Sequence, residues 1–368
     1  MRRGSTVNLT CEVLPKLAFK SSRFAKKVMS SKLYKIGWRL LQAVPSIFGV
    51  IVISFVLTRA LPGDPAVYFA GAMADKESIE QVRQALGLDR SWVEQFFIYV
   101  GNLAQGDWGQ SLKTGQPVTE ELLKRLPASL ELTFIGLGLA VLAAVPLGIL
   151  AATNPGSWVD HICRLLVTAG VSLPTFFTGL FLIYIFYYLL GWSPSPLGRL
   201  NILYLSPSHV TGFYIIDSLI AGDLEIFLGA LAQLILPTIT LGLFALAPIA
   251  RMTRGAMLGA LSSDYVRTAR ANGLSKSMIL LTYAFRNASL PVLTTLGMVF
   301  SFLLGANVLV EKVFSWPGIG SFAIEALIAS DYAAVQGFVL SMALLFITVN
   351  LTIDVILAIT DPRVGLEE

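Results

Sequence analysis

The chain has 368 residues, of which 55% are hydrophobic and only 14% are charged. Soluble globular proteins carry about 25% charged residues, so this composition excludes a soluble globular protein and indicates a protein that is mostly embedded in a membrane. The formal net charge of +4 reflects an uneven distribution of basic residues between segments, and we do not interpret it as nucleic-acid binding.

Stretches without Asp, Glu, Lys or Arg predict six transmembrane helices, and hence an all-α membrane protein. A spanning helix needs about 20 apolar residues. The charge-free run 200–216 is not counted, because it contains Asn201, Pro207 and Gly212. The second and third of the six remaining runs are longer than one span, so we expect their ends to include loop. The six runs are 40–58, 132–159, 165–198, 226–250, 287–310 and 332–353.

Basic residues predict the orientation of these helices. Segment 1–39 contains ten Lys and Arg residues and one acidic residue, and loop 251–286 contains six and one, whereas segment 61–131 contains six basic and ten acidic residues. Because cytoplasmic loops carry an excess of Lys and Arg, we predict a cytoplasmic N-terminus, loop 251–286 and C-terminus. Segment 61–131 is then extracytoplasmic. The basic tail, 1–36, either contacts anionic membrane lipid or stays solvated.

The first predicted transmembrane helix covers 37–61. We expect Pro45 to kink it, because proline removes a helix hydrogen bond. The sequence Leu-Pro-Gly-Asp-Pro at 61–65 is expected to end it on the far side of the membrane.

A helical extracytoplasmic insertion is predicted over 62–128, which is long enough to carry structure of its own. Helical periodicity at 78–86 and 92–103 predicts two helices, and a third is predicted around 120–125, ending before Pro127. The insertion either meets a protein that delivers substrate or serves as a scaffold cap.

The remaining five spans form a predicted transmembrane core over 129–361, followed by a cytoplasmic tail at 362–368. A short inner turn is expected at 154–157, and the sequence Ser-Leu-Pro at 172–174 is expected to break the third span. Cys11 and Cys163 lack a C-x-x-C spacing, and His161 and His209 fall on opposite sides of the membrane. We therefore predict no disulfide, no metal site and no cofactor.

Loop 251–289 contains a short amphipathic helix, a glycine turn and a second helix. Ser262 or Ser263 is expected to cap the first helix, and Asp264 stands in its first turn, where the helix dipole favours a negative charge. Gly273 is expected to end it, since glycine adopts the left-handed conformation without strain. One side of this helix is predicted to carry Leu261, Tyr265, Ala269 and Asn272, and the other side Arg267 and Arg270. Ser275 is expected to cap the second helix.

This loop resembles the cytoplasmic EAA motif of bacterial ABC importer permeases, in the form typical of dipeptide and oligopeptide permeases. The glutamate that names the motif is replaced by Arg267, and Thr268 stands for its first alanine. The resemblance rests on Ala269, Gly273, Arg286-Asn287-Ala288 and Leu290-Pro291. It implies that the loop, here called the coupling loop (251–289), docks on an ATPase. The residues implied in docking are Asp264, Tyr265, Arg267, Thr268, Ala269, Arg270, Gly273, Leu290 and Pro291.

Further signatures of the same family follow in the same order over about 33–365. They are the Leu-Pro-Gly-Asp-Pro exit, then Gly101, Gly106, Asp107, Gly109, Ser111 and Pro117-Val118, then Glu311, Phe314 and Trp316-Pro317-Gly318, and last Asn350-Leu351, Asp354 and Asp361-Pro362-Arg363. The resemblance implies three kinds of partner: two cytoplasmic ATPase subunits, a second and different permease chain, and an extracytoplasmic binding protein. Membrane lipid is a further expected partner, because most of the chain is predicted to lie in the membrane.

Three polar residues inside predicted spans are candidate gate or pathway residues. Asp354 lies about 10 Å above the end of its helix, and Asn350 is on the same face. A carboxylate at that depth is costly unless it is paired or wet. Asp354 is therefore either a gate or part of a helix-packing ion pair with Arg251 or Arg254. Glu311 either lines a pathway or caps the loop after it.

The chain has no phosphate-binding G-x-x-x-x-G-K-[ST] sequence, so we predict that it does not hydrolyse ATP itself and is not an enzyme. The resemblance implies that separate subunits hydrolyse ATP. A G-x-G-x-x-A pattern at 318–323 follows a span without a preceding strand, which argues against dinucleotide binding. The predicted function is the permease subunit of an ATP-driven importer for short peptides in the bacterial inner membrane. Import of nickel or glutathione is the alternative, and an ion-coupled secondary transporter using Asp354 is a further one.

Overall fold

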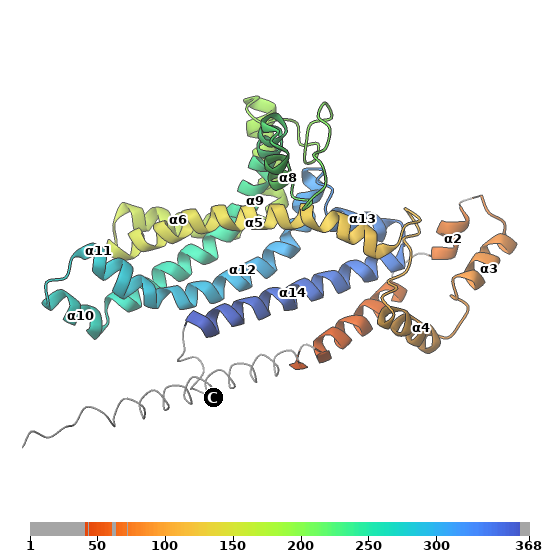
Figure 1. Cartoon of the computed structure of the whole chain (residues 1–368), viewed down its shortest axis with the longest axis horizontal. Coiled ribbons are helices and arrows are strands. Elements are labelled where there is room, and N and C mark those ends of the chain that lie inside the picture. Colours follow the sequence, from red (N-terminus) through yellow and green to blue (C-terminus); the bar gives the residue numbers. More distant parts are fainter. Residues whose placement is uncertain (1–40, 43, 61–63, 72, 361–368) are drawn as a thin grey trace, which may run out of the picture.

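The computed structural model describes residues 41–42, 44–60, 64–71 and 73–360. The whole predicted basic tail, 1–36, and the whole predicted C-terminal tail, 362–368, lie outside the described residues. The described chain is built of helices (Figure 1). It contains no strand in that part of the sequence, apart from an isolated bridge between Gln110 and Pro117. The predicted all-α class is confirmed.

A helix over Val44–Ala60 precedes the labelled elements. The insertion then contributes three short helices, and the helices that follow are longer and mostly apolar. In chain order the elements are α2 (Pro65–Ala70), α3 (Lys76–Ala85), α4 (Trp92–Ala104), α5 (Val118–Thr153), α6 (Trp158–Ser172), α7 (Thr175–Leu182), η1 (Ile183–Leu189), α8 (Tyr214–Ala221), α9 (Leu224–Leu261), α10 (Asp264–Ala271), α11 (Lys276–Met278), η2 (Ile279–Phe285), α12 (Arg286–Val313), α13 (Ile319–Ile328) and α14 (Tyr332–Thr360).

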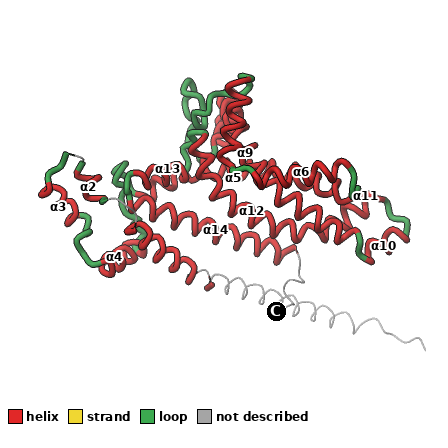
Figure 2. Tube along the Cα trace, turned by 180° about the vertical axis from the view of Figure 1, so that it is seen from behind, coloured by secondary structure: helices red, strands yellow, loops and turns green. Residues whose placement is uncertain are grey.

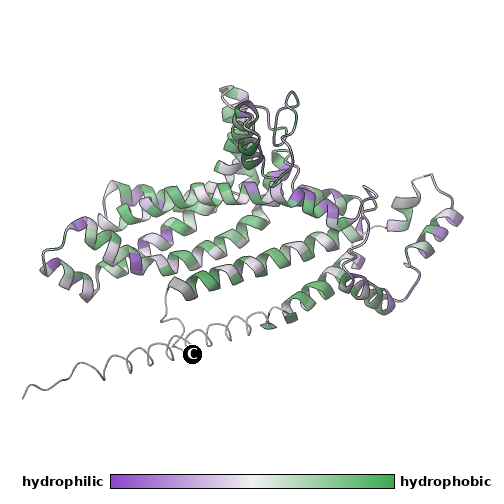
Figure 3. Ribbon diagram, in the orientation of Figure 1, coloured by the Kyte–Doolittle hydropathy of each residue, from purple (hydrophilic) through white to green (hydrophobic). Residues whose placement is uncertain are grey.

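Among the described residues, four helices are long and apolar enough to cross a membrane, and Figure 3 shows that hydrophobic residues predominate along them. They are Val118–Thr153, Leu224–Leu261, Lys276–Val313 and Tyr332–Leu357. A fifth span is present if the pair Trp158–Gly170 and Thr175–Leu189, bent by 106°, counts as one. The apolar helix Val44–Ala60 is shorter, so a sixth span remains a prediction.

Helix α9 lies at the centre of the bundle, because half of its most apolar stretch is buried, compared with 6% for α14. Small residues let its neighbours approach closely, as is usual where helices pack within lipid. A Cβ atom added to Gly148 of α5 would lie 2.7 Å from Cβ of Thr253, and one at Gly136 would lie 3.0 Å from Cβ of Leu241. The buried core extends from this contact to α6 and α12.

The short helices of the coupling loop and those of the insertion lie at opposite ends of the long helices. Helices α10 and α11 lie at one end, whereas α13 and the insertion helices α2, α3 and α4 lie at the other (Figures 1 and 2). The loop after η1 and α8 project to one side of the long helices. The predicted separation of segment 61–131 from loop 251–286 is therefore present in the fold.

Two local expectations about helix boundaries can be compared with the structure. The third span is broken as predicted, since α6 ends at Ser172 and Leu173 has an extended backbone. The predicted helix end before Pro127 is wrong, because α5 continues through this proline. Proline removes only the hydrogen bond to the carbonyl four residues earlier. That carbonyl belongs to Leu123, which is 69% exposed, so no buried polar group is left without a partner.

The orientation of the two ends is testable with single cysteines. The test uses a Cys11→Ser and Cys163→Ala background with either Gln105→Cys in the insertion or Ser277→Cys beside α10, both at exposed positions. From the distribution of Lys and Arg, we expect a membrane-impermeant maleimide to label Gln105→Cys in intact cells. Ser277→Cys should be labelled only after permeabilisation. Labelling in the opposite order would reverse the predicted orientation.

Candidate functional site

The coupling loop begins in the last part of α9, and its first separate helix, α10, follows α9 after only two residues. Ser263 is the residue before the helix, but its hydroxyl donates to the carbonyl of Ala260 at 2.5 Å. The Ser262 hydroxyl donates to Gly259 at 3.0 Å. The expected capping by a serine side chain is thus wrong, because both hydroxyls bond back to the last turn of α9. Asp264 occupies the first turn, as predicted.

Gly273 ends α10 through a pair of backbone hydrogen bonds. Its N–H donates to the Arg270 carbonyl at 3.0 Å, and the N–H of Leu274 donates to the Ala269 carbonyl at 3.3 Å. This is the Schellman arrangement, which requires a left-handed residue, and Gly273 has φ +74°. A Cβ atom at this position would meet nothing within 4 Å. The glycine is therefore required for its backbone conformation and not for space.

The two faces of α10 differ in what they contact. Val266 and Ala269 are buried and pack against Ile279 of η2, with Leu274 and Tyr283 at the edge. Ala269 therefore faces its own chain and supports the loop from inside. The exposed face contains Asp264, Tyr265, Arg267, Thr268 and Arg270.

The second part of the coupling loop runs without interruption into a membrane span. Ser275 accepts from the N–H of Met278 at 3.4 Å, which confirms its predicted capping role. Elements α11, η2 and α12 then form one helical segment, Lys276–Val313. Leu290 and Pro291 lie in α12, and Pro291 is exposed.

Glu311 is buried at the opposite end of the bundle, where it holds the start of α13. Its carboxylate accepts from the Ser129 hydroxyl at 2.5 Å, from Asn307 at 3.0 Å and from the N–H of Ser321 at 2.9 Å. A side chain at Gly318 would collide with this carboxylate, and one at Gly320 would meet the Cα atom of Val308 at 2.7 Å and the carboxylate at 3.0 Å. The two glycines of the G-x-G-x-x-A pattern thus make room for Glu311, which serves as the cap of α13.

The other two gate candidates lie on α14. The side-chain amide of Asn350 donates to the carbonyl of Phe346 in its own helix at 2.9 Å. Asp354 lies one turn further along the same helix and is half-buried. Arg254, one of its two suggested partners, forms an ion pair with Asp160 of α6 at 2.6 Å.

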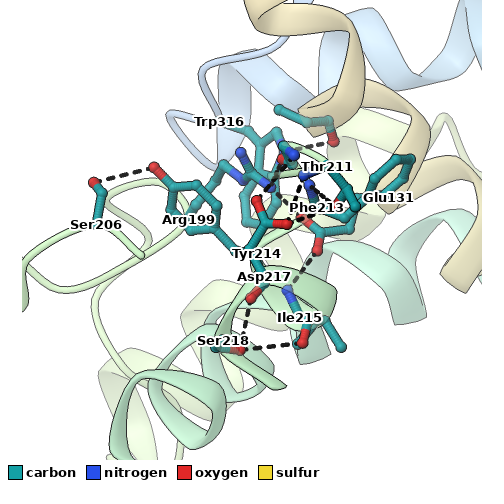
Figure 4. Close-up of polar contacts among 12 residues, drawn as sticks. Glu131, Arg199, Ser206, Thr211, Phe213, Tyr214, Ile215, Asp217, Ser218 and Trp316 are labelled. Carbon is teal, nitrogen blue, oxygen red and sulfur yellow. Dashed lines mark hydrogen bonds and ion pairs between the residues drawn. The ribbon is translucent and has the colours of Figure 1, made fainter. Parts of the chain in front are cut away.

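A second buried ion pair was not expected from the sequence. Glu131 of α5 and Arg199 of the loop before α8 are 2% and 8% exposed, and their charged groups are 2.5 Å apart (Figure 4). The guanidinium of Arg199 stacks 3.5 Å from the ring centre of Tyr214 and donates to the Gly212 carbonyl at 2.8 Å. Glu131 also accepts from the N–H of Ile215 at 3.0 Å. The one sequence signal is a lone acidic residue at the edge of an apolar run.

Asp217 of α8 organises the turn next to this pair. It accepts from the hydroxyl and N–H of Thr211 at 2.7 and 2.8 Å, and from the N–H of Gly212 at 2.9 Å. Burial raises the pKa of the Asp217 carboxyl, but these hydrogen bonds lower it by more, so its pKa lies below the ordinary value. Glu131, Arg199 and Asp217 together fix the loop between η1 and α8 to α5.

The insertion is also fixed to the end of the bundle. Ser111 is buried, and its hydroxyl donates to Asp331 at 2.6 Å. Lys113 pairs with Glu325 of α13 at 2.5 Å, and this hydrogen-bonded pair lowers the pKa of the Glu325 carboxyl. The glycine-containing stretch of the insertion therefore docks on α13 and the start of α14. No cluster of metal-ligating side chains occurs among the described residues.

Comparison with known proteins finds matches over most of the chain. Residues 144–366 match the family described as the binding-protein-dependent transport system inner membrane component, and residues 34–133 match its N-terminal family. The chain is 45% identical to the probable D,D-dipeptide transport system permease protein DdpB of Escherichia coli K12, over 86% of this chain and 93% of that protein.

Two further relatives carry related names. The di/tripeptide transport system permease protein DppB of Pseudomonas aeruginosa is 44% identical over 89% of this chain and 98% of its own length. The glutathione transport system permease protein GsiC of Shigella flexneri is 37% identical over 89% of this chain and 97% of its own length.

The contribution of the buried pair of Glu131 and Arg199 to stability can be tested by substitution. Arg199→Met leaves a buried carboxylate without its cation, which costs about 3–5 kcal/mol. We expect a marked fall in the thermal unfolding temperature of the protein purified in detergent. The double variant Glu131→Gln with Arg199→Met should recover much of this loss. Arg90→Met, which removes an exposed pair with Glu94, should change stability by less than about 1 kcal/mol. Equal losses for Arg199→Met and Arg90→Met would contradict the assignment.

Proposed function

Because this chain belongs to the inner-membrane components of binding-protein-dependent transport systems, we propose that it is the membrane-spanning permease subunit of an ATP-driven importer for short peptides. The relatives with 44–45% identity are permeases of dipeptide or di/tripeptide transport systems. Import of glutathione is the second candidate, since a glutathione permease is 37% identical over nearly the same length. Glutathione is itself a small peptide-like molecule, so both candidates require the same kind of pathway.

The coupling role of loop 251–289 is supported by one observation, the position of α10 between two membrane spans. It follows α9 after two residues, and its buried residues Val266 and Ala269 pack on η2, which continues into α12. A force on the exposed face of α10 therefore acts on both spans. Displacement of such a packed unit alternates access to a pathway by moving helices as rigid bodies.

The proposed partners follow from this arrangement. A cytoplasmic ATPase binds the exposed face of α10 and hydrolyses ATP, since the chain lacks a phosphate-binding loop sequence. A second permease chain and membrane lipid contact the sparsely buried surface of α14. An extracytoplasmic binding protein delivers the substrate at the end that carries the insertion and α13. The protein then lies in the bacterial inner membrane with both termini in the cytoplasm.

The structure supports different roles for the three candidate gate residues. Glu311 caps α13 from a buried position, which favours a positioning role over direct contact with substrate. Asn350 and Asp354 lie on α14, one turn apart. We propose that they belong to the moving surface of this helix.

Gly273→Val tests the coupling role. Valine is strained at φ +74° by about 1–3 kcal/mol, so the chain should relax by shifting the end of α10 and with it the exposed face that includes Tyr265. We expect the ATPase subunits to stop co-purifying with the permease, while permease abundance in the membrane is unchanged.

The matched control is Gly259→Val near the end of α9. This glycine also has open space around its Cβ position, but its backbone is helical. It should retain the ATPase and transport activity. Normal ATPase binding and normal transport by Gly273→Val would show that this loop is not the coupling element.

The substrate is tested by uptake. Deleting the gene should abolish the uptake of radiolabelled di- and tripeptides, and a plasmid copy should restore it. Loss of glutathione or nickel uptake with normal peptide uptake would keep the transporter class and reject the peptide assignment.

A further inference from the structure

The inner end of α9, which enters the coupling loop, is joined to α6 by a partly buried ion pair. Asp160, in the first turn of α6, is fully buried. The guanidinium of Arg254 donates to both of its oxygens, from Nε at 2.6 Å and from Nη2 at 3.1 Å. The same carboxylate accepts from Arg164 at 2.7 Å and from the N–H of Gly156 at 3.0 Å. It is the meeting point of α6, α9 and the turn after α5.

The position of Arg254 relates this pair to the coupling loop. Arg254 lies seven residues before the end of α9 at Leu261, which is about 10 Å along the helix axis, and α10 begins after two further residues. A displacement of α10 therefore reaches Arg254 before it reaches the centre of the bundle. Because the guanidinium binds the carboxylate through two parallel hydrogen bonds, the pair fixes orientation as well as distance.

Close backbone packing holds the same helices together further along. A Cβ atom at Gly170 of α6 would lie 3.0 Å from the Leu243 carbonyl of α9. Helix α6 thus contacts α9 at both of its ends, by the ion pair at one and by a glycine at the other. Between α6 and α7 the chain turns by 106°.

We propose that the Asp160–Arg254 pair is the positioning link that makes α6 move as one body with the inner end of α9 when α10 is displaced. The proposal rests on the coupling role of α10 proposed above. The pair carries the motion to a further helix, in addition to α9 and η2, which α10 contacts directly, and α12, which continues from η2. Asp160 and Arg254 are positioning residues in this proposal and need not touch the substrate.

The experiment measures whether α6 and the coupling loop stay together during the ATP cycle. Spin labels are placed at exposed Thr168 on α6 and exposed Ser277 on α11, in the Cys11→Ser and Cys163→Ala background. The distance between them is measured in the assembled complex without nucleotide and after trapping with ATP and vanadate. With the native pair, we expect a narrow distance distribution that is the same in both states. Asp160→Asn and Arg254→Gln should broaden or shift it on trapping.

The control is Arg125→Gln at the other end of the bundle. Arg125 is 27% exposed, compared with 26% for Arg254, and also pairs with a carboxylate, that of Glu121. It should leave the distance unchanged in both states. Should Asp160→Asn fail to accumulate, Arg254→Lys decides the question, because it keeps the charge and removes the double hydrogen bond.

Two results would overturn the proposal. One is a native distance that changes on trapping, and the other is a distance that stays fixed when the pair is removed. Co-purification of the ATPase is recorded for every variant. If the coupling role of α10 is wrong, the Gly273→Val variant still binds the ATPase. If the link is wrong, the spin-label distance does not respond to loss of the Asp160–Arg254 pair in complexes that still contain the ATPase.

Discussion

The close contact between α9 and its neighbours is the constraint on which the rest of the structure depends. Lipid removes most of the hydrophobic drive that holds soluble helices together, so packing and small residues must replace it. Gly136 and Gly148 of α5 and Gly170 of α6 bring their helices against the backbone and side chains of α9. As a result α9 packs against α5, α6, α7, α8 and α12. The helix that enters the coupling loop is therefore also the one that most of the bundle contacts.

Buried carboxylates fix the positions of elements that the glycine contacts with α9 do not hold. Each of Glu131, Asp160 and Glu311 is almost fully buried, and each accepts hydrogen bonds from a segment distant in sequence. An unpaired carboxylate at these places would be strongly unfavourable, so the partners must stay in register. Glu131 holds the loop before α8, Asp160 joins α6 to α9, and Glu311 holds α13. The polar groups of this membrane protein thus specify positions that apolar packing alone would not.

Local chemistry explains which features were predictable from the sequence. The end of α10 at Gly273, the cap at Ser275 and the break at 172–174 depend on neighbouring residues only, and the structure contains all three. The inward orientation of Ala269 was missed because helical spacing does not reveal which face of a short helix finds a partner. The pair of Glu131 and Arg199 joins residues 68 apart, and single residues in apolar runs carry no sign of their partners. The predicted helix end before Pro127 was wrong because Leu123, whose carbonyl loses its hydrogen bond to this proline, is exposed. That exposure is set by the tertiary fold and is not visible in the sequence.

The prolines of α9 show how this helix combines rigidity with movement. Pro237 and Pro248 lie inside it, and each removes one backbone hydrogen bond and permits a bend. The stretch of the helix between Pro248 and α10 contains both Thr253, against Gly148, and Arg254, paired with Asp160. This inner stretch is fixed to two other helices and is separated from the centre of the bundle by a proline. A load applied at α10 is consequently shared among α5, α6 and α9 at the inner end, before any bending at Pro248 transfers it to the centre.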